Sequence, residues 1–409
     1  MRTISHEAMK SSVIILSLFF ALYIGALGLF QPFITLHFHS LGMSGIQIGV
    51  LTTVSSLLAL LSAPIIGSIY DKSSHKRLLF ITLLVLSGVF LLLIGWIKYY
   101  PLVIILFSIY RIGASTNIPI AENLAYSVGG RKGEGKRFGF GFMRLWGSIA
   151  FTMTALAGGW FAEKFNLQGN FVIFLGFMLL AASLMFFLSP EMFDHTKKKI
   201  SSEHPQDSSI LRIIFRDKYL LLLIAAMALT HPLGNGIRQF EPIFMSQLQI
   251  RQSMIGLAAA LSALTEVPFM LWADYLIHRF GITKILLVVF AIDLSRRLLV
   301  WFFPIGWMVF VTHVATSISF SMRLVTTVSL VNLRIPAKHT TTSLALISMT
   351  IYSISNMISS AVSGLLFDVY GGRTLYLYSA VGCLISLCLS LLARKIEMRA
   401  KESPQIVSV

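Results

Sequence analysis

Long apolar stretches alternate with short polar ones along nearly the whole chain. Twelve apolar runs of about 20–30 residues occupy positions 12–37, 46–70, 78–97, 101–127, 138–162, 170–189, 217–246, 254–276, 283–303, 306–333, 340–367 and 372–393. A helix needs about 20 mostly apolar residues to cross the hydrocarbon core of a bilayer. Each run is therefore long enough to span a membrane, and the pattern predicts an all-α membrane protein with 12 transmembrane helices.

Composition and charge exclude most soluble classes of protein. Hydrophobic residues make up 56% of the 409 residues and charged residues 12%, whereas soluble domains average about 25% charged residues. The net charge of +16 would suggest a nucleic-acid partner in a soluble protein. However, 23 of the 33 lysines and arginines fall at the two ends and in or at the edges of the even-numbered connections, 4 in or at the edges of the odd-numbered connections and 6 well within the runs. The positive-inside rule then predicts that both termini are cytoplasmic, with no nucleic-acid partner.

The longest polar stretch, residues 190–217, separates the first six runs from the last six. We interpret it as a flexible cytoplasmic linker. It would join an N-terminal six-helix bundle, residues 1–189, to a C-terminal six-helix bundle, residues 218–393. Residues 394–409 are expected to form a cytoplasmic tail.

Several landmarks of the first half recur in the second half. The matched sets are Phe30-Gln31-Pro32 and Gly49 with Phe240-Glu241-Pro242 and Gly256, Gly159 and Glu163 with Gly364 and Asp368, and Asp71 with Asp274. Any one match could arise by chance among apolar helices, but all three fall at equivalent topological positions. They indicate two six-helix pseudo-repeats, an architecture of secondary transporters.

The connection after the second run carries a recognisable motif. Residues 67–77 read GSIYDKSSHKR, which resembles the signature Gly-x-x-x-Asp-[Arg/Lys]-x-Gly-[Arg/Lys]-[Arg/Lys] of the major facilitator superfamily. Ser74 replaces the signature glycine and His75 replaces one basic residue. The resemblance implies the major facilitator fold and a gating latch in this loop, although positive charge that merely sets topology is the alternative. The latch residues would be Asp71, Lys72, Lys76 and Arg77, with Asp274 at the equivalent place in the second half.

Charged residues inside the apolar runs are the main candidates for function. Ten lie well inside a run, away from its edges: Arg111, Glu122, Arg144, Arg238, Glu241, Glu266, Asp293, Arg296, Arg297 and Arg323. On insertion scales each costs about 2.5–3.5 kcal/mol, and such residues usually face a cavity with a partner. Two groups have the spacing for pairing along one helix: Arg238 with Glu241, and Asp293 with Arg296 or Arg297.

Glu122 and Arg144 form the strongest candidate pair. Glu122 lies late in the fourth run and Arg144 early in the fifth, so the two should reach a similar depth on adjacent helices. The surrounding sequence FGFMRLWGSIAF resembles the Gly-x-x-Arg-x-x-Gly helix of the branch that contains the lactose permease, nucleoside symporters and phenylpropionate permeases. This resemblance implies that Glu122 and Arg144 bind the substrate and that Phe151 stacks on it.

The same resemblance suggests a proton-coupling pair, Glu266 and Arg296. Glu266 lies near the middle of the eighth run with no basic residue within one helical turn, and a carboxyl group in such surroundings suits reversible protonation. His313 is not followed by the acid of the family's His-x-x-Glu pattern, which argues against lactose as the substrate.

Two polar residues of the seventh run are further candidates for substrate binding. His231 and Asn235 lie beside Pro232 and Gly234, and this combination predicts an interrupted helix whose polar groups face a cavity.

These observations predict a proton-coupled symporter of a small organic solute, working by alternating access in the cell membrane. The solute would be an aromatic carboxylate, a nucleoside or a sugar, and the excess of arginines within the spans favours an anion. A proton-driven exporter is the first alternative, and a non-transporting membrane sensor or enzyme is the second. We expect a monomer in contact with lipid, with no catalytic residue, no metal and no cofactor, driven by the proton gradient.

Overall fold

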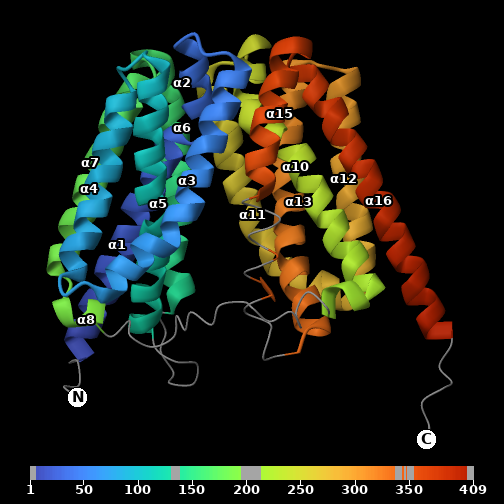
Figure 1. The fold of residues 1–409 in the computed structure, drawn as a ribbon, viewed down its shortest axis with the longest axis horizontal. Coiled ribbons are helices and arrows are strands. Elements are labelled where there is room, and N and C mark those ends of the chain that lie inside the picture. Colours follow the sequence, from blue (N-terminus) through green and yellow to red (C-terminus); the bar gives the residue numbers. More distant parts are fainter. Residues whose placement is uncertain are drawn as a thin grey trace, which may run out of the picture. The chain divides into compact units, whose positions relative to one another are not determined.

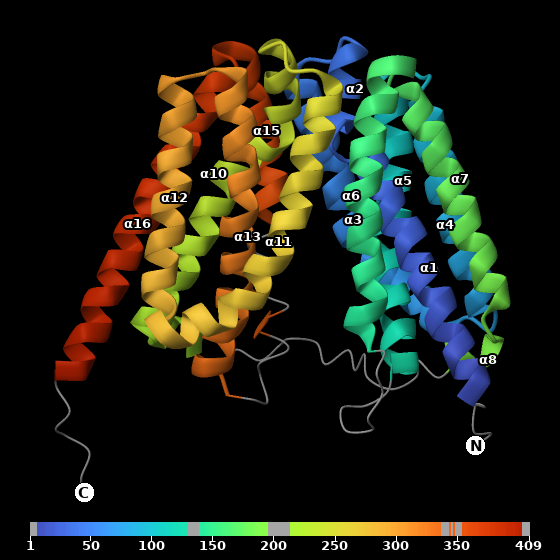
Figure 2. The ribbon, with the colours of Figure 1, turned by 180° about the vertical axis from the view of Figure 1, so that it is seen from behind.

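The computed structural model describes residues 6–129, 139–194, 213–336, 343, 344, 347 and 354–402. Within these residues the secondary structure is helical (Figures 1 and 2). The elements are α1 (His6–Phe30), α2 (Ile34–Ser40), α3 (Gly45–Lys72), α4 (Lys76–Ile94), α5 (Tyr100–Gly129), α6 (Phe140–Phe165), α7 (Gln168–Leu184), η1 (Met185–Phe187), α8 (Pro190–Asp194), α10 (Lys218–Gln247), α11 (Gln252–Phe280), α12 (Ile282–Phe302), α13 (Gly306–Arg334), α15 (Ser355–Tyr370) and α16 (Gly372–Glu402).

The helices correspond to the apolar runs of the sequence. Ten segments of the described chain are long and apolar enough to cross a membrane. The two remaining runs correspond to α12, which carries several charged residues, and to α15, the described part of the run at 340–367. The prediction of an all-α membrane fold is confirmed. The last helix runs further than expected, because α16 continues from the predicted span into the predicted tail as far as Glu402.

Proline has different effects in the first and seventh runs. The first run is divided, because α1 ends at Phe30 and α2 begins at Ile34, with Pro32 in the turn between them. Proline has no N–H to donate to the helix, so a break there is expected. By contrast, α10 is continuous through Pro232, and the predicted interruption of the seventh run is wrong. In membrane helices, neighbouring helices and local adjustments satisfy the carbonyl that a proline leaves free.

The chain forms two compact units. Unit 1 comprises Met1–Met43, Leu51–Ser201 and Ile250–Leu264, and unit 2 comprises Ser44–Val50, Ser202–Gln249 and Thr265–Val409. Most of the predicted linker, residues 195–212, lies outside the described part of the chain. At its end Asp217 caps α10, because its carboxylate accepts hydrogen bonds from the backbone N–H groups of Tyr219 and Leu220 at 3.0 and 3.1 Å.

In unit 1, α1 packs closely against α6. The Thr154 hydroxyl of α6 donates to the backbone carbonyl of Gly25 on α1 at 2.6 Å. A Cβ on Gly28 would overlap the same hydroxyl and lie 2.6 Å from the Phe151 carbonyl oxygen. The Asn170 amide of α7 donates to the carbonyls of Leu29 and Gly158 at 2.8 and 3.0 Å. Hydrogen bonds between helices therefore support apolar packing, as is common in membrane bundles.

In unit 2, α10 is the central helix and contacts α16 and α15. The Ser386 hydroxyl of α16 donates to the Ala226 carbonyl of α10 at 2.7 Å, and the Thr230 hydroxyl donates to Ser386 at 2.6 Å. On another face of α10, Gly236 lies so close to Ser363 of α15 that any Cβ would overlap that side chain. Small residues thus bring the helix backbones together.

The matched residues of the two pseudo-repeats make equivalent contacts. In unit 2, the Asp368 carboxylate of α15 accepts hydrogen bonds from the N–H groups of Gly45 and Ile46, at the start of α3, at 2.6 and 2.8 Å. In unit 1, the Glu163 carboxylate of α6 accepts from the Ser253 N–H, at the start of α11, at 3.3 Å. Each carboxylate therefore caps the N-terminus of a helix, a position that favours negative charge.

Replacing Gly28 by valine should destabilise unit 1 by about 1–3 kcal/mol, the usual cost of forcing extra atoms into a packed interface. The added side chain would collide with Thr154 and with the α6 backbone. Thermal unfolding in detergent would measure the effect. The control is Gly176→Val on α7, where a Cβ meets no atom within 4 Å. Equal melting temperatures for the two variants would contradict the packing described.

Candidate functional site

Glu122 of α5 and Arg144 of α6 form an ion pair in unit 1. The pair is accessible, because 29% of the Glu122 side chain and 48% of the Arg144 side chain are exposed. Phe151 is seven residues beyond Arg144, about two helical turns, and so lies on the same face of α6. The expectation that the two charges reach a similar depth on adjacent helices is confirmed. This face offers an acceptor, a forked donor and an aromatic ring.

Arg111, three turns before Glu122 on α5, is held by a neutral partner. Its guanidinium donates to the Ser56 hydroxyl of α3 at 3.3 Å. The Arg111 charge is thus hydrogen-bonded without being neutralised by this contact.

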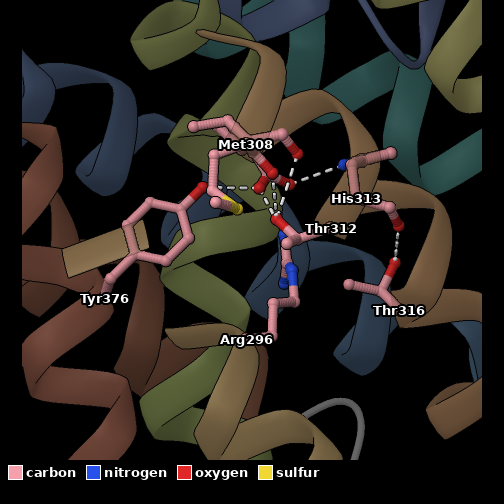
Figure 3. Close-up of polar contacts among 8 residues, drawn as sticks. Arg296, Met308, Thr312, His313, Thr316 and Tyr376 are labelled. Atoms are coloured by element: carbon pink, nitrogen blue, oxygen red, sulfur yellow. Dashed lines mark hydrogen bonds and ion pairs between the residues drawn. The ribbon is translucent and has the colours of Figure 1, made fainter. Parts of the chain in front are cut away.

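Unit 2 contains a buried cluster around Glu241 of α10. Its carboxylate, 2% exposed, pairs with Arg296 of α12. It also accepts from the Tyr376 hydroxyl of α16 at 2.5 Å and lies 2.6 Å from Nδ1 of His313 on α13. Figure 3 shows Arg296, His313 and Tyr376 converging from three directions. Four helices therefore meet at one carboxylate.

A second buried carboxylate, Asp293 of α12, joins two arginines. It pairs with Arg323 of α13, and with Arg297 on its own helix at 3.5 Å. The predicted i,i+4 pairing of Asp293 with Arg297 is confirmed. The Arg297 guanidinium also lies 2.6 Å from the Cys383 sulfur, and it approaches α10 so closely that a Cβ on Gly234 would be 2.8 Å from it. Gly234 therefore leaves room for the Arg297 guanidinium against α10.

Glu266 of α11 has a basic neighbour from another helix. It interacts electrostatically with Arg238 of α10, a neighbour that the sequence argument did not include because it considered only one turn of the same helix. Within the described residues, Arg238 forms no ion pair with Glu241, which pairs with Arg296 instead, although the i,i+3 spacing would allow one. His231 and Asn235, the other candidates on α10, are each partly exposed.

The residues assigned to gating lie in two different environments. Asp71, Lys72 and Asp274 are exposed, whereas Lys76 is buried and Arg77 is partly buried. Arg77 donates to the backbone carbonyls of Phe186 and Leu188 at 3.4 and 3.2 Å. No ion pair within the described residues joins any two of these five side chains.

Sequence reasoning did not identify Glu241, His313 and Tyr376 as one cluster. Glu241 and His313 were each noticed, but their partners lie on helices that are far apart in the sequence. The clearest signal available was that a buried acid requires a partner. Among the described residues, no group of three or more His, Cys, Asp or Glu side chains is placed to hold a metal ion.

Comparisons with known proteins extend over nearly the whole chain. A sequence profile of the MFS_1 like family matches residues 13–378. The chain is 25% identical over 386 residues to the maltose permease of Geobacillus stearothermophilus, covering 94% of this chain and 95% of the permease. It is 23% identical over 238 residues to sugar efflux transporter A of Dickeya chrysanthemi, covering 58% of each chain.

A solved structure shares the fold. The crystal structure of the nucleoside transporter NupG matches with a TM-score of 0.79, covering 95% of this chain and 99% of that one. At 14% identity, this likeness concerns the fold alone.

Removal of the Glu241 carboxylate should lower the stability of the protein much more than removal of the Glu122 carboxylate. Glu241→Ala leaves Arg296 buried without its partner and should cost about 3–5 kcal/mol of stability. Glu122→Ala removes an accessible partner and should cost about 1 kcal/mol or less. Thermal unfolding of both variants in the same detergent measures the difference. If Glu122→Ala melted at as low a temperature as Glu241→Ala, the difference in exposure between the two ion pairs would not determine their contribution to stability.

Proposed function

The chain belongs to the MFS_1 like family, a family of multi-pass membrane transporters rather than enzymes, and we propose that it is a proton-coupled symporter of a neutral saccharide. It works by alternating access. The observation that carries the proposal is the accessible Glu122–Arg144 pair, which lies on the same face of α6 as Phe151.

The charge balance of this pair favours a neutral, hydroxyl-rich solute. A sugar hydroxyl can donate to the Glu122 carboxylate and accept from the Arg144 guanidinium while the ion pair persists. An aromatic carboxylate would instead compete with Glu122 for Arg144. An aromatic ring such as Phe151 suits the apolar face of a sugar or of a nucleoside base. The maltose permease and the sugar efflux transporter favour the saccharide, whereas the likeness to NupG, which shares the fold, does not choose between them.

Proton coupling is assigned to unit 2. We assign the exchanging carboxylate to Glu266, because it is partly exposed near the middle of the eighth run and interacts electrostatically with Arg238. Arg296 contributes by holding Glu241 in the buried cluster. His231 and Asn235, on α10, are proposed to contact the solute.

The remaining assignments follow from the charge distribution and the family. Both termini are cytoplasmic, because 23 of the 33 basic residues lie on that side under the positive-inside rule. The protein resides in the cell membrane as a monomer, and the proton gradient drives it without a cofactor. The exposed charges Asp71, Lys72 and Asp274 remain proposed gating residues, together with Lys76 and Arg77.

The experiment that tests this function is uptake of labelled maltose into proteoliposomes with an inward proton gradient. We expect accumulation that an uncoupler abolishes. Nucleosides and aromatic acids are offered in parallel, and accumulation of one of these in place of maltose would overturn the saccharide assignment. Failure of all three classes to accumulate would overturn the proposed symport.

Export is the second candidate, favoured by the sugar efflux relative. Cells that overproduce the protein would then lose preloaded saccharide faster than control cells. Retention of the preloaded sugar together with gradient-driven uptake would exclude it.

Substitution of the pair should weaken saccharide binding. Glu122→Gln removes the charged acceptor and Arg144→Lys removes the forked donor, so each should raise the apparent dissociation constant by about tenfold or more, as for loss of a hydrogen bond to a charged group. Ligand-induced thermal shift with maltose measures this constant. The matched controls are Glu191→Gln and Arg216→Lys, two exposed charges outside the predicted spans. Unchanged binding in both variants would remove the pair from the site.

Glu266→Gln should separate transport from its driving force. A glutamine cannot exchange a proton, so accumulation against a gradient should be lost while exchange of internal for external sugar continues. The two assays use the same proteoliposomes, with and without the proton gradient. Glu191→Gln again serves as the control. Normal gradient-driven accumulation by Glu266→Gln would assign coupling to another group.

A further inference from the structure

Unit 1 contains a basic cavity at the turn between α3 and α4. It has a volume of about 320 Å³ and is lined by Ser74, His75, Lys76 and Arg77 on one side and by Phe186 and Phe193 on the other. Its size is at the lower end of the range of about 300–1,000 Å³ typical of small-molecule sites. Pro190 and Phe193 of α8 also line the cavity, and α8 lies at the end of unit 1 where the chain begins (Figure 1).

Lys76 is the notable residue of this cavity. It is only 4% exposed, and its side chain lines the cavity. Within the described residues, no carboxylate forms an ion pair with it. A buried ammonium group without a counter-charge is costly, because burial removes its water without supplying a partner. An anion in the cavity would provide the missing partner.

The start of α4 adds donors at the same place. Lys76 is the first residue of this 19-residue helix, and the side chain of its N-cap, His75, makes no capping hydrogen bond. The first N–H groups of a helix have no partner within it, and the helix dipole favours an anion there. Helix N-termini are common binding sites for phosphate groups for this reason.

Arg77 supplies a second positive charge whose position is fixed. Its hydrogen bonds to the carbonyls of Phe186 and Leu188 orient the guanidinium, which also lies 5.8 Å from the centre of the Phe186 ring. These partners are uncharged, so the positive charge stays available to an anion. Arginine, lysine and helix N–H groups together form the donor set that recognises phosphate.

We propose that this cavity binds a phosphate group, supplied either by the headgroup of an acidic phospholipid or by a soluble phosphate. The phosphate oxygens accept from the Lys76 ammonium, the Arg77 guanidinium and the N–H groups at the start of α4. Basic pockets between membrane helices are suited to acidic lipid headgroups. This assignment does not depend on the identity of the transported solute.

The test is thermal unfolding of the purified, delipidated protein in detergent with three separate probes. The probes are inorganic phosphate, dihexanoyl phosphatidylglycerol and dihexanoyl phosphatidylcholine, each compared with sodium chloride at the same ionic strength. We expect phosphatidylglycerol to raise the melting temperature by several degrees and phosphatidylcholine, whose choline carries a compensating positive charge, to have little effect. A shift with phosphatidylglycerol alone identifies a lipid headgroup as the source, whereas a shift with inorganic phosphate alone identifies a soluble phosphate.

Three variants link the shift to the cavity. Lys76→Gln should weaken the apparent affinity by about tenfold or more, and Lys76→Arg, which keeps the charge, should retain it. The matched control is Lys284→Gln, which removes an exposed lysine from the first turn of α12, the helix of unit 2 equivalent to α4. Without ligand, Lys76→Gln should fold normally, because it removes a buried charge that has no ion-pair partner among the described residues. The proposal is overturned if neither phosphate nor phosphatidylglycerol shifts the wild-type protein, or if Lys76→Gln and Lys284→Gln respond alike.

Discussion

The fold depends on one constraint: a charge removed from water must meet a partner, and in this protein the partner usually comes from another helix. Glu241 shows the consequence most clearly, because its carboxylate draws α12, α13 and α16 onto α10 through Arg296, His313 and Tyr376. In a bilayer, apolar side chains are as well solvated by lipid as by protein, so apolar contacts alone do little to determine which helices pack together. Buried ion pairs and close contacts between small residues determine it instead.

Exposure divides the charged groups into two kinds. The carboxylates of Glu241 and Asp293 are almost wholly buried, and their oxygens are occupied by arginine, histidine and tyrosine donors. These clusters hold unit 2 together. The Glu122–Arg144 pair satisfies its charge in a single contact and keeps part of both side chains accessible. A solute can therefore reach it without first separating two buried charges, and this is why we propose this pair, and not the buried clusters, as the solute-binding site.

Sequence reasoning succeeded where the determining contacts are local or lie between consecutive helices. Hydropathy located the membrane helices, because length and apolarity alone decide whether a segment can span. Glu122 and Arg144 could be paired because one descending helix is followed directly by one ascending helix. Glu241 could not be paired with Arg296, since the choice among neighbours depends on how α10 and α12 pack, and the spacing along the helix suggested Arg238 instead. The partner of Glu266 was missed for the same reason.

The pseudo-repeats show which features are tied to the architecture and which are not. Gly159 and Glu163 in one half correspond to Gly364 and Asp368 in the other, and both sets place a carboxylate on the N-terminus of a helix that a glycine allows to approach. These contacts recur because the same backbone arrangement recurs. The charged chemistry does not recur: unit 1 has an accessible pair, whereas unit 2 has two buried clusters. The shared architecture cannot explain that difference between the two units. Solute binding and proton coupling should therefore be sought among the charged residues in which the units differ.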